Sequence, residues 1–124
     1  RRMALDLGLD VEIVGAPLVR EEDGVAASSR NVRLDAHERT RARALSEGLR
    51  AARAAFEAGE RRAAELLDAV RGPLAREQLA PDYLELRHAS DLSKLERADE
   101  PCVILLAVRV GSTRLLDNHI LRRP

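Results

Sequence analysis

Val103-Ile-Leu-Leu-Ala-Val-Arg-Val110, followed directly by Gly111-Ser112 and Thr113-Arg-Leu-Leu-Asp-Asn-His-Ile-Leu121, is the stretch of sequence that decides the fold. The first run is almost continuously apolar, which is typical of a strand buried on both faces. The second run mixes apolar and polar residues in strand fashion. Gly111-Ser112 lies where two antiparallel strands would turn, so the stretch predicts a hairpin whose first strand is central in a sheet.

Two helices are predicted before this hairpin. Asp35 followed by Glu38 has the pattern of a capping box, and apolar residues recur at helical spacing from there to Gly59. A second helix is expected from about Glu60 to Arg71. Because a proline inside a continuous helix costs about 3 kcal/mol, we expect Gly72-Pro73 to end this helix and Pro73 to open a new short one through Leu79.

Tyr83-Leu-Glu-Leu-Arg-His88 alternates and supplies a third strand. A sheet with one apolar side needs helices to cover that side. We therefore predict an α+β fold, a three-stranded antiparallel sheet with helices packed on one face. At the start of the chain, Arg1 to Leu9 have the pattern of the last turns of a helix ending near Gly8, and Val11 to Val14 have that of a short apolar strand, so this αβ unit belongs to a larger sheet.

Composition argues against several kinds of partner. The 21 basic and 21 acidic residues cancel, and with one Phe, one Tyr and no Trp there is little to stack on bases, so we expect no nucleic acid partner. No apolar run approaches membrane-spanning length, and no signal peptide is visible, so we expect no membrane partner. The lone Cys102 lies in an apolar run, which predicts a buried side chain in a reducing cytoplasm.

The segment Arg20-Glu-Glu-Asp-Gly-Val-Ala-Ala-Ser-Ser-Arg-Asn31 has the residue types of a phosphate grip. The hydroxyls of Ser28 and Ser29 can donate hydrogen bonds, and the planar guanidinium of Arg30 fits phosphate oxygens. Gly24 permits backbone angles that other residues avoid. An ordinary polar turn leading into a helix would have the same composition, and the residues alone leave that alternative open.

Five ordered segments together carry a family resemblance. They are Val11-Glu-Ile-Val-Gly15, Pro17 with Val19-Arg-Glu-Glu-Asp-Gly24, Ser28-Ser-Arg-Asn31, Asp82-Tyr-Leu-Glu-Leu-Arg87 and Arg109-Val-Gly-Ser-Thr-Arg-Leu-Leu-Asp-Asn118. In these segments the chain resembles the C-terminal part of the pantothenate synthetase (pantoate–beta-alanine ligase) family. The resemblance implies that residues 1–16 are the terminal αβ remnant of a Rossmann-like N-terminal domain and that residues 17–124 are a C-terminal lid domain.

In that family ATP and pantoate give pantoyl adenylate, which β-alanine converts to pantothenate. The resemblance implies that Ser28, Ser29 and Arg30 contact the phosphates of ATP and that Val19 and Ala27 lie along the adenine. Ala27 departs from the family, whose members usually have Met there. The catalytic groups belong to the N-terminal domain, so no catalytic residue is assigned here, and Mg²⁺ is expected in the full enzyme without ligands from this chain.

Other polar residues have simpler interpretations. Asn31 and Asp35 are expected to act as loop and helix caps, and Glu21, Glu22 and Asp23 to be solvated. His37, His88 and His119 are scattered without metal-ligand spacing. Two functions stay open: the lid of an ATP-dependent ligase, inactive alone, and a non-catalytic interaction module that keeps the lid fold. The unpaired strand at Val11 to Val14 predicts a homodimer or a swapped terminal segment.

Overall fold

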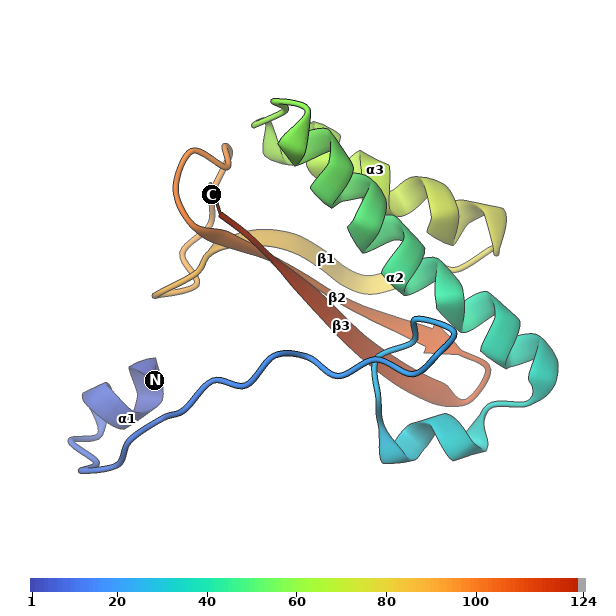
Figure 1. Ribbon diagram of the computed structural model, residues 1–124, viewed down its shortest axis with the longest axis horizontal. Helices are drawn as coiled ribbons and strands as arrows, with labels where there is room; N and C mark the ends of the chain where they lie inside the picture. The colour runs from blue at the N-terminus through green and yellow to red at the C-terminus, as the bar shows by residue number, and fades with distance from the viewer. Residues whose placement is uncertain (123–124) are drawn as a thin grey trace.

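The computed structural model describes residues 1–122, and its sheet has the predicted topology. Strands β1 (Pro81–His88), β2 (Cys102–Val110) and β3 (Thr113–Leu121) form an antiparallel sheet in the order β1-β2-β3 (Figure 1). Val110 pairs with Thr113 across a two-residue turn in which Gly111 has φ +56°. A positive φ at the first turn residue alone is the pattern of a type II′ turn, which suits the twist of a hairpin.

Helices α2 (Ala36–Glu57) and α3 (Ala63–Arg76) cover one face of the sheet, as predicted (Figure 1). The capping box of Asp35 and Glu38 is present, and Gly59 at φ +104° follows the end of α2. The core lies between the helices and the sheet. Its fully buried large side chains include those of Leu49 on α2, Leu66, Val70 and Leu74 on α3, and Ile104, Leu106, Val108, Val110 and Leu121 on the sheet.

The prediction that Pro73 opens a new helix is wrong, because α3 runs through it to Arg76. Pro73 falls in the last turn of α3, so the helix loses one backbone hydrogen bond close to its end. Val70 before the proline and Leu74 after it are both buried in the same core. Burial of two large apolar side chains, each contributing about 1.5 to 3 kcal/mol, offsets the cost of the proline.

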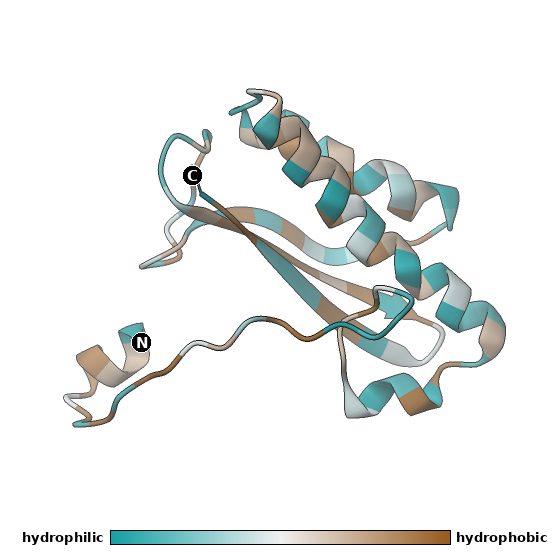
Figure 2. Ribbon diagram, viewed as in Figure 1, coloured by the Kyte–Doolittle hydropathy of each residue, from teal (hydrophilic) through white to brown (hydrophobic). Residues whose placement is uncertain are grey.

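The N-terminal segment carries the short helix α1 (Arg2–Asp6), which is followed by Gly8 with φ +60° as expected. The strand predicted at Val11 to Val14 is wrong: residues 9–19 are an extended arm outside any strand, with α1 at its far end (Figure 1). A strand needs a neighbour for its backbone groups, and this segment does not pair with the sheet. Val11, Ile13 and Val14 are 57%, 43% and 77% exposed, so apolar residues of the arm face solvent (Figure 2).

Candidate functional site

The candidate site is a short hairpin between the arm and α2. Arg20 and Ala26 form an antiparallel bridge, and the amide of Ala27 donates to the carbonyl of Val19 over 2.9 Å. The turn is closed by a hydrogen bond of 2.9 Å that the Gly24 amide donates to the Glu21 carbonyl, and Gly24 has φ +88°. The hairpin therefore places Val19 beside Ala27, two residues that the sequence assigned to one site.

The 3-10 helix η1 (Ser29–Arg33) follows the hairpin directly. Ser28 caps it, because its Oγ accepts a hydrogen bond from the amide of Arg30 at 3.2 Å. Ser29 and Arg30 are exposed. Within residues 1–122 the Arg30 guanidinium makes no hydrogen bond or ion pair, so its donors face solvent and can bind an anion.

Asn31 fastens η1 to the hairpin and is more than the cap that was predicted. It is 5% exposed, and its Nδ2 donates to Glu21 Oε1 at 2.5 Å and to the carbonyl of Ala26 at 3.0 Å. Its Oδ1 has no hydrogen-bond partner among the described residues. The carboxamide thus ties both sides of the hairpin to the loop that carries the serines.

Arg39 of α2 clamps the turn of the hairpin. Its Nε lies 2.6 Å from Asp23 Oδ2 and its Nη2 lies 2.6 Å from Glu21 Oε2. These hydrogen bonds are the main reason that the pKa values of both carboxyls are lowered from their ordinary values. The prediction that Glu21 and Asp23 are merely solvated is therefore wrong, whereas Glu22 between them is exposed as expected.

Arg20 fastens the base of the hairpin to the sheet. Its two terminal nitrogens meet the carboxylate of Asp117 on β3 at 2.7 and 3.0 Å, and Nη1 also donates to the Gly24 carbonyl at 3.1 Å. The Asp117 side chain is only 2% exposed, against 29% for Arg20. The amide of Asn118 also donates to Asp117 Oδ1 at 2.7 Å, so the buried carboxylate is well paired.

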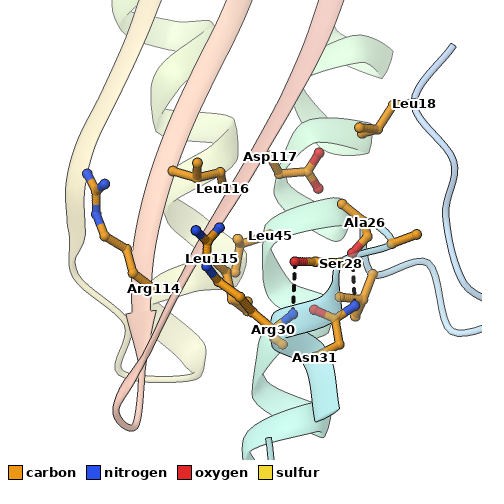
Figure 3. Close-up of a pocket in the computed structure, with 13 residues that line it drawn as sticks. Leu18, Ala26, Ser28, Arg30, Asn31, Leu45, Arg114, Leu115, Leu116 and Asp117 are labelled. Carbon is orange, nitrogen blue, oxygen red and sulfur yellow. Dashed lines mark hydrogen bonds between the residues drawn. The ribbon is translucent and has the colours of Figure 1, made fainter. Parts of the chain in front are cut away.

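Two hollows adjoin the loop. A cavity of about 190 Å³ lies between the loop, α2 and β3, where Figure 3 shows Arg30 reaching from the loop toward the leucines of β3. It is lined by Leu18, Val25, Ala26, Ala27, Ser28, Arg30, Asn31, Ala42, Leu45, Arg114, Leu115, Leu116 and Asp117. The second hollow, of about 260 Å³, lies between η1 and the β2–β3 turn and shares Arg30 with the first. Arg30 can therefore reach a ligand in either hollow.

The structure thus brings together the five residues predicted for the site, Val19, Ala27, Ser28, Ser29 and Arg30, within one hairpin and the start of η1. Sequence reasoning did not identify the contacts by which Arg20, Arg39 and Asp117 hold them in place. Glu21 and Arg39 are 18 residues apart in the sequence, and Arg20 and Asp117 are 97 apart, so no local pattern could have predicted these pairs.

The carboxylates near the loop do not fit a magnesium site. Arg39 pairs with Glu21 and Asp23, and Arg20 pairs with Asp117. Across residues 1–122 no group of three or more His, Cys, Asp or Glu side chains is placed to hold a metal ion. His88 lies away from the loop, near Asp91 and Glu100. Over the same part of the chain, no helix has the length and apolar character to cross a membrane.

Comparisons with known proteins agree on one class, the ligases. The family model described as pantoate-beta-alanine ligase matches residues 1–120. A pantothenate synthetase of Geobacter sp. (strain M21) is 48% identical over 128 residues, covering 98% of this chain and 44% of the relative. One of Syntrophotalea carbinolica is 50% identical over 120 residues, covering 96% and 42%. The chain belongs to the pantoate-beta-alanine ligase family.

Solved structures give the same result. The pantothenate synthetase of Thermus thermophilus superposes with a TM-score of 0.87 at 39% identity, over 95% of this chain and 43% of that one. A pantoate-beta-alanine ligase of Francisella tularensis has a TM-score of 0.58 at 23% identity, a likeness of fold alone. The chain spans less than half the length of the curated relatives that it matches, 44% for the Geobacter protein.

Proposed function

We propose that this chain is the ATP-covering C-terminal domain of a pantothenate synthetase. In this proposal residues 17–124 form the domain, of which Arg123 and Pro124 lie outside the described residues, and residues 1–16 are the end of a preceding Rossmann-like domain. The support is the Ser28-to-Arg30 loop: it is fixed by Asn31, Arg39 and Asp117, while Ser29 and Arg30 stay exposed. Donors that are held in place before a ligand arrives bind it with little reorganisation.

The reaction of the full enzyme explains these residue types. The pantoate carboxylate attacks the α-phosphorus of ATP, the bond to the β-phosphate oxygen breaks, and pyrophosphate leaves with the negative charge. The β-alanine amine then attacks the acyl carbon of pantoyl adenylate, loses a proton, and AMP leaves. Ser28, Ser29 and Arg30 would stabilise charge on the leaving pyrophosphate, and the backbone of Val19 and Ala27 would lie along the adenine.

Each partner in this proposal follows from that role. ATP, pantoate and β-alanine are substrates of the full enzyme, and Mg²⁺ would accompany ATP without ligands from the carboxylates described above. The chain alone would make no pantothenate, because the groups that bind pantoate and assist adenylation lie elsewhere. The comparisons lend no support to the alternative of a non-catalytic interaction module.

The test is adenylation by the two-domain parent enzyme carrying Arg30→Ala or Arg30→Lys. A charge-assisted hydrogen bond to phosphate contributes about 1.5 to 3 kcal/mol, so the alanine variant should lose roughly tenfold or more in adenylation rate. Lysine keeps the charge but lacks the planar fork, so it should recover only part of that loss. A pre-steady-state rate within about twofold of the unmodified enzyme for Arg30→Ala would refute the proposal.

A further inference from the structure

Arginine side chains gather around the hollow between η1 and the β2–β3 turn. It is lined by Arg30, Arg33, Ser112, Thr113, Arg114 and Leu116, three cations and no carboxylate. Asp82, on β1, lies 2.6 Å from Arg114 and 3.9 Å from Arg109, so two guanidinium groups share one carboxylate. With Glu38 beside Gly111 counted as well, the surroundings of the hollow carry four arginines against two carboxylates, an excess of positive charge.

Arg30 and Arg33 both bring unpaired guanidinium groups to this hollow. Among the described residues Arg43, Arg50 and Arg122 are also unpaired, but they do not line it. Most of the chain's arginines pair with a carboxylate, but across residues 1–122 neither Arg30 nor Arg33 makes a side-chain hydrogen bond or ion pair. The hydroxyl of Thr113 at the same hollow is buried and likewise has no hydrogen-bond partner in the described part of the chain. Unpaired guanidinium groups beside hydroxyl donors have the composition of a phosphate site.

The wall opposite η1 is fixed in place. Gly111 lies so close to α2 that a Cβ atom there would collide with Glu38 Oε1, and Glu38 is itself held by the capping box. On the other side, Asn31 and Ser28 hold η1. Both walls of the hollow are therefore positioned before any ligand binds, which lowers the entropy lost on binding.

From these observations we propose that Arg33 and Arg114 form, together with Arg30, a subsite for the terminal phosphates of a polyphosphate. The inference rests on the proposed function, in which Ser28, Ser29 and Arg30 contact the phosphates of ATP and stabilise charge on the leaving pyrophosphate. Arg30, Arg114 and Leu116 line both hollows, so a phosphate chain held at the serines would continue into this subsite. Arg33 and Arg114 then bind the terminal phosphate of that pyrophosphate.

The experiment is a titration of this chain with tripolyphosphate, followed by the amide shifts of residues 28–33 and 111–116 in NMR spectra. Arg33→Gln and Arg114→Gln should each weaken tripolyphosphate binding by about three- to tenfold. The matched control is Arg71→Gln on α3, which removes the same charge from an exposed arginine away from the loop and should change the affinity by less than about twofold. Equal effects of Arg33→Gln and Arg71→Gln would overturn the subsite.

Asp82→Asn separates phosphate binding from a merely structural role of Arg114. If Arg114 only fastened the sheet edge through Asp82, removing either partner would have the same effect on binding. As a phosphate ligand, Arg114 is freed by Asp82→Asn, so that variant should bind tripolyphosphate more tightly while Arg114→Gln binds it more weakly. Weakening by both variants would contradict the assignment of Arg114.

Arg30→Gln in the same titration distinguishes the two proposals. If it weakens binding while Arg33→Gln and Arg114→Gln do not, the subsite is wrong and the proposed function stands. If Arg33→Gln and Arg114→Gln weaken binding while Arg30→Gln does not, the phosphate role of the loop fails. Absence of detectable tripolyphosphate binding by the unmodified chain would also overturn the subsite.

Discussion

Breaking the Arg20–Asp117 pair from its two sides should destabilise the chain unequally. Arg20→Met leaves the Asp117 carboxylate, which is 2% exposed, without its guanidinium partner. Asp117→Asn instead leaves Arg20, which is 29% exposed and can turn toward water. The loss of stability depends on which charge stays buried without a partner, so Arg20→Met should be less stable than Asp117→Asn.

The magnitudes follow from the remaining contacts. Removing one partner of a buried pair costs about 3 to 5 kcal/mol, and we expect the lower end for Arg20→Met because the amide of Asn118 still donates to Asp117 Oδ1. Asp117→Asn keeps an acceptor for one nitrogen of Arg20, so about 1 to 2 kcal/mol is expected. The double variant should be more stable than the sum of the single losses predicts, by at least about 1 kcal/mol.

Urea unfolding of the three variants, followed by circular dichroism, gives these free energies. The two single variants should differ by several degrees in melting temperature, because 1 kcal/mol shifts a domain of this size by roughly 3 to 6 °C. Amide exchange of residues 20–27 should accelerate in Arg20→Met, since the hairpin loses its anchor to β3. An Asp117→Asn variant as unstable as Arg20→Met, or additive losses in the double variant, would refute this account of the pair.

Three further predictions concern packing, pH and association. Gly48→Ala should lower the free energy of unfolding, measured in urea, by about 1 to 2 kcal/mol. The new Cβ would lie 2.7 Å from the carbonyl of Val70, and this overpacking exceeds the gain in helix propensity. Gly72→Ala is the control and should not destabilise the chain, because its Cβ meets nothing within 4 Å. The lowered pKa values of Glu21 and Asp23 contribute stability that is complete above the ordinary pKa values and is lost as pH falls through the lowered ones. Arg39→Gln should therefore make the urea midpoint depend less steeply on pH in the acid range. An unchanged pH dependence would contradict the clamp. We also expect a homodimer by light scattering, because residues 11–14 pair with no strand of the sheet and expose apolar side chains. A monomer at high concentration would show that the arm stays free.

The elements that could be predicted from sequence are those whose signals are local. The hairpin of β2 and β3 follows from an apolar run, a glycine turn and an alternating run, and α2 follows from a capping box and a terminal glycine. The prediction that Pro73 opens a new helix was wrong because the cost of a proline within α3 is offset by burial of the apolar side chains on both sides of it. The strand at Val11 to Val14 was wrong because its formation depends on a neighbour that the pattern of four residues does not contain.

The residues of the candidate site likewise fall into those that the sequence predicts and those that only the fold reveals. Ser28, Ser29 and Arg30 were identified from adjacent residue types and a family resemblance, but the residues that hold them are contributed by α2 and β3. Glu21 and Asp23 show the difficulty, since adjacent carboxylates in a turn are usually solvated and only the fold shows that Arg39 reaches both. An ion pair between distant segments leaves no spacing to find in one sequence.

The two clamps also have an electrostatic consequence for the proposed polyphosphate subsite. Glu21, Asp23 and Asp117 lie in or beside the hairpin, and as free carboxylates they would repel an incoming phosphate chain. Arg39 and Arg20 neutralise them locally, so the unpaired guanidinium groups of the loop dominate the field that a ligand meets. The clamping arginines therefore support anion binding in two ways, by fixing the loop and by cancelling the negative charge beside it, although neither lines the arginine-rich hollow.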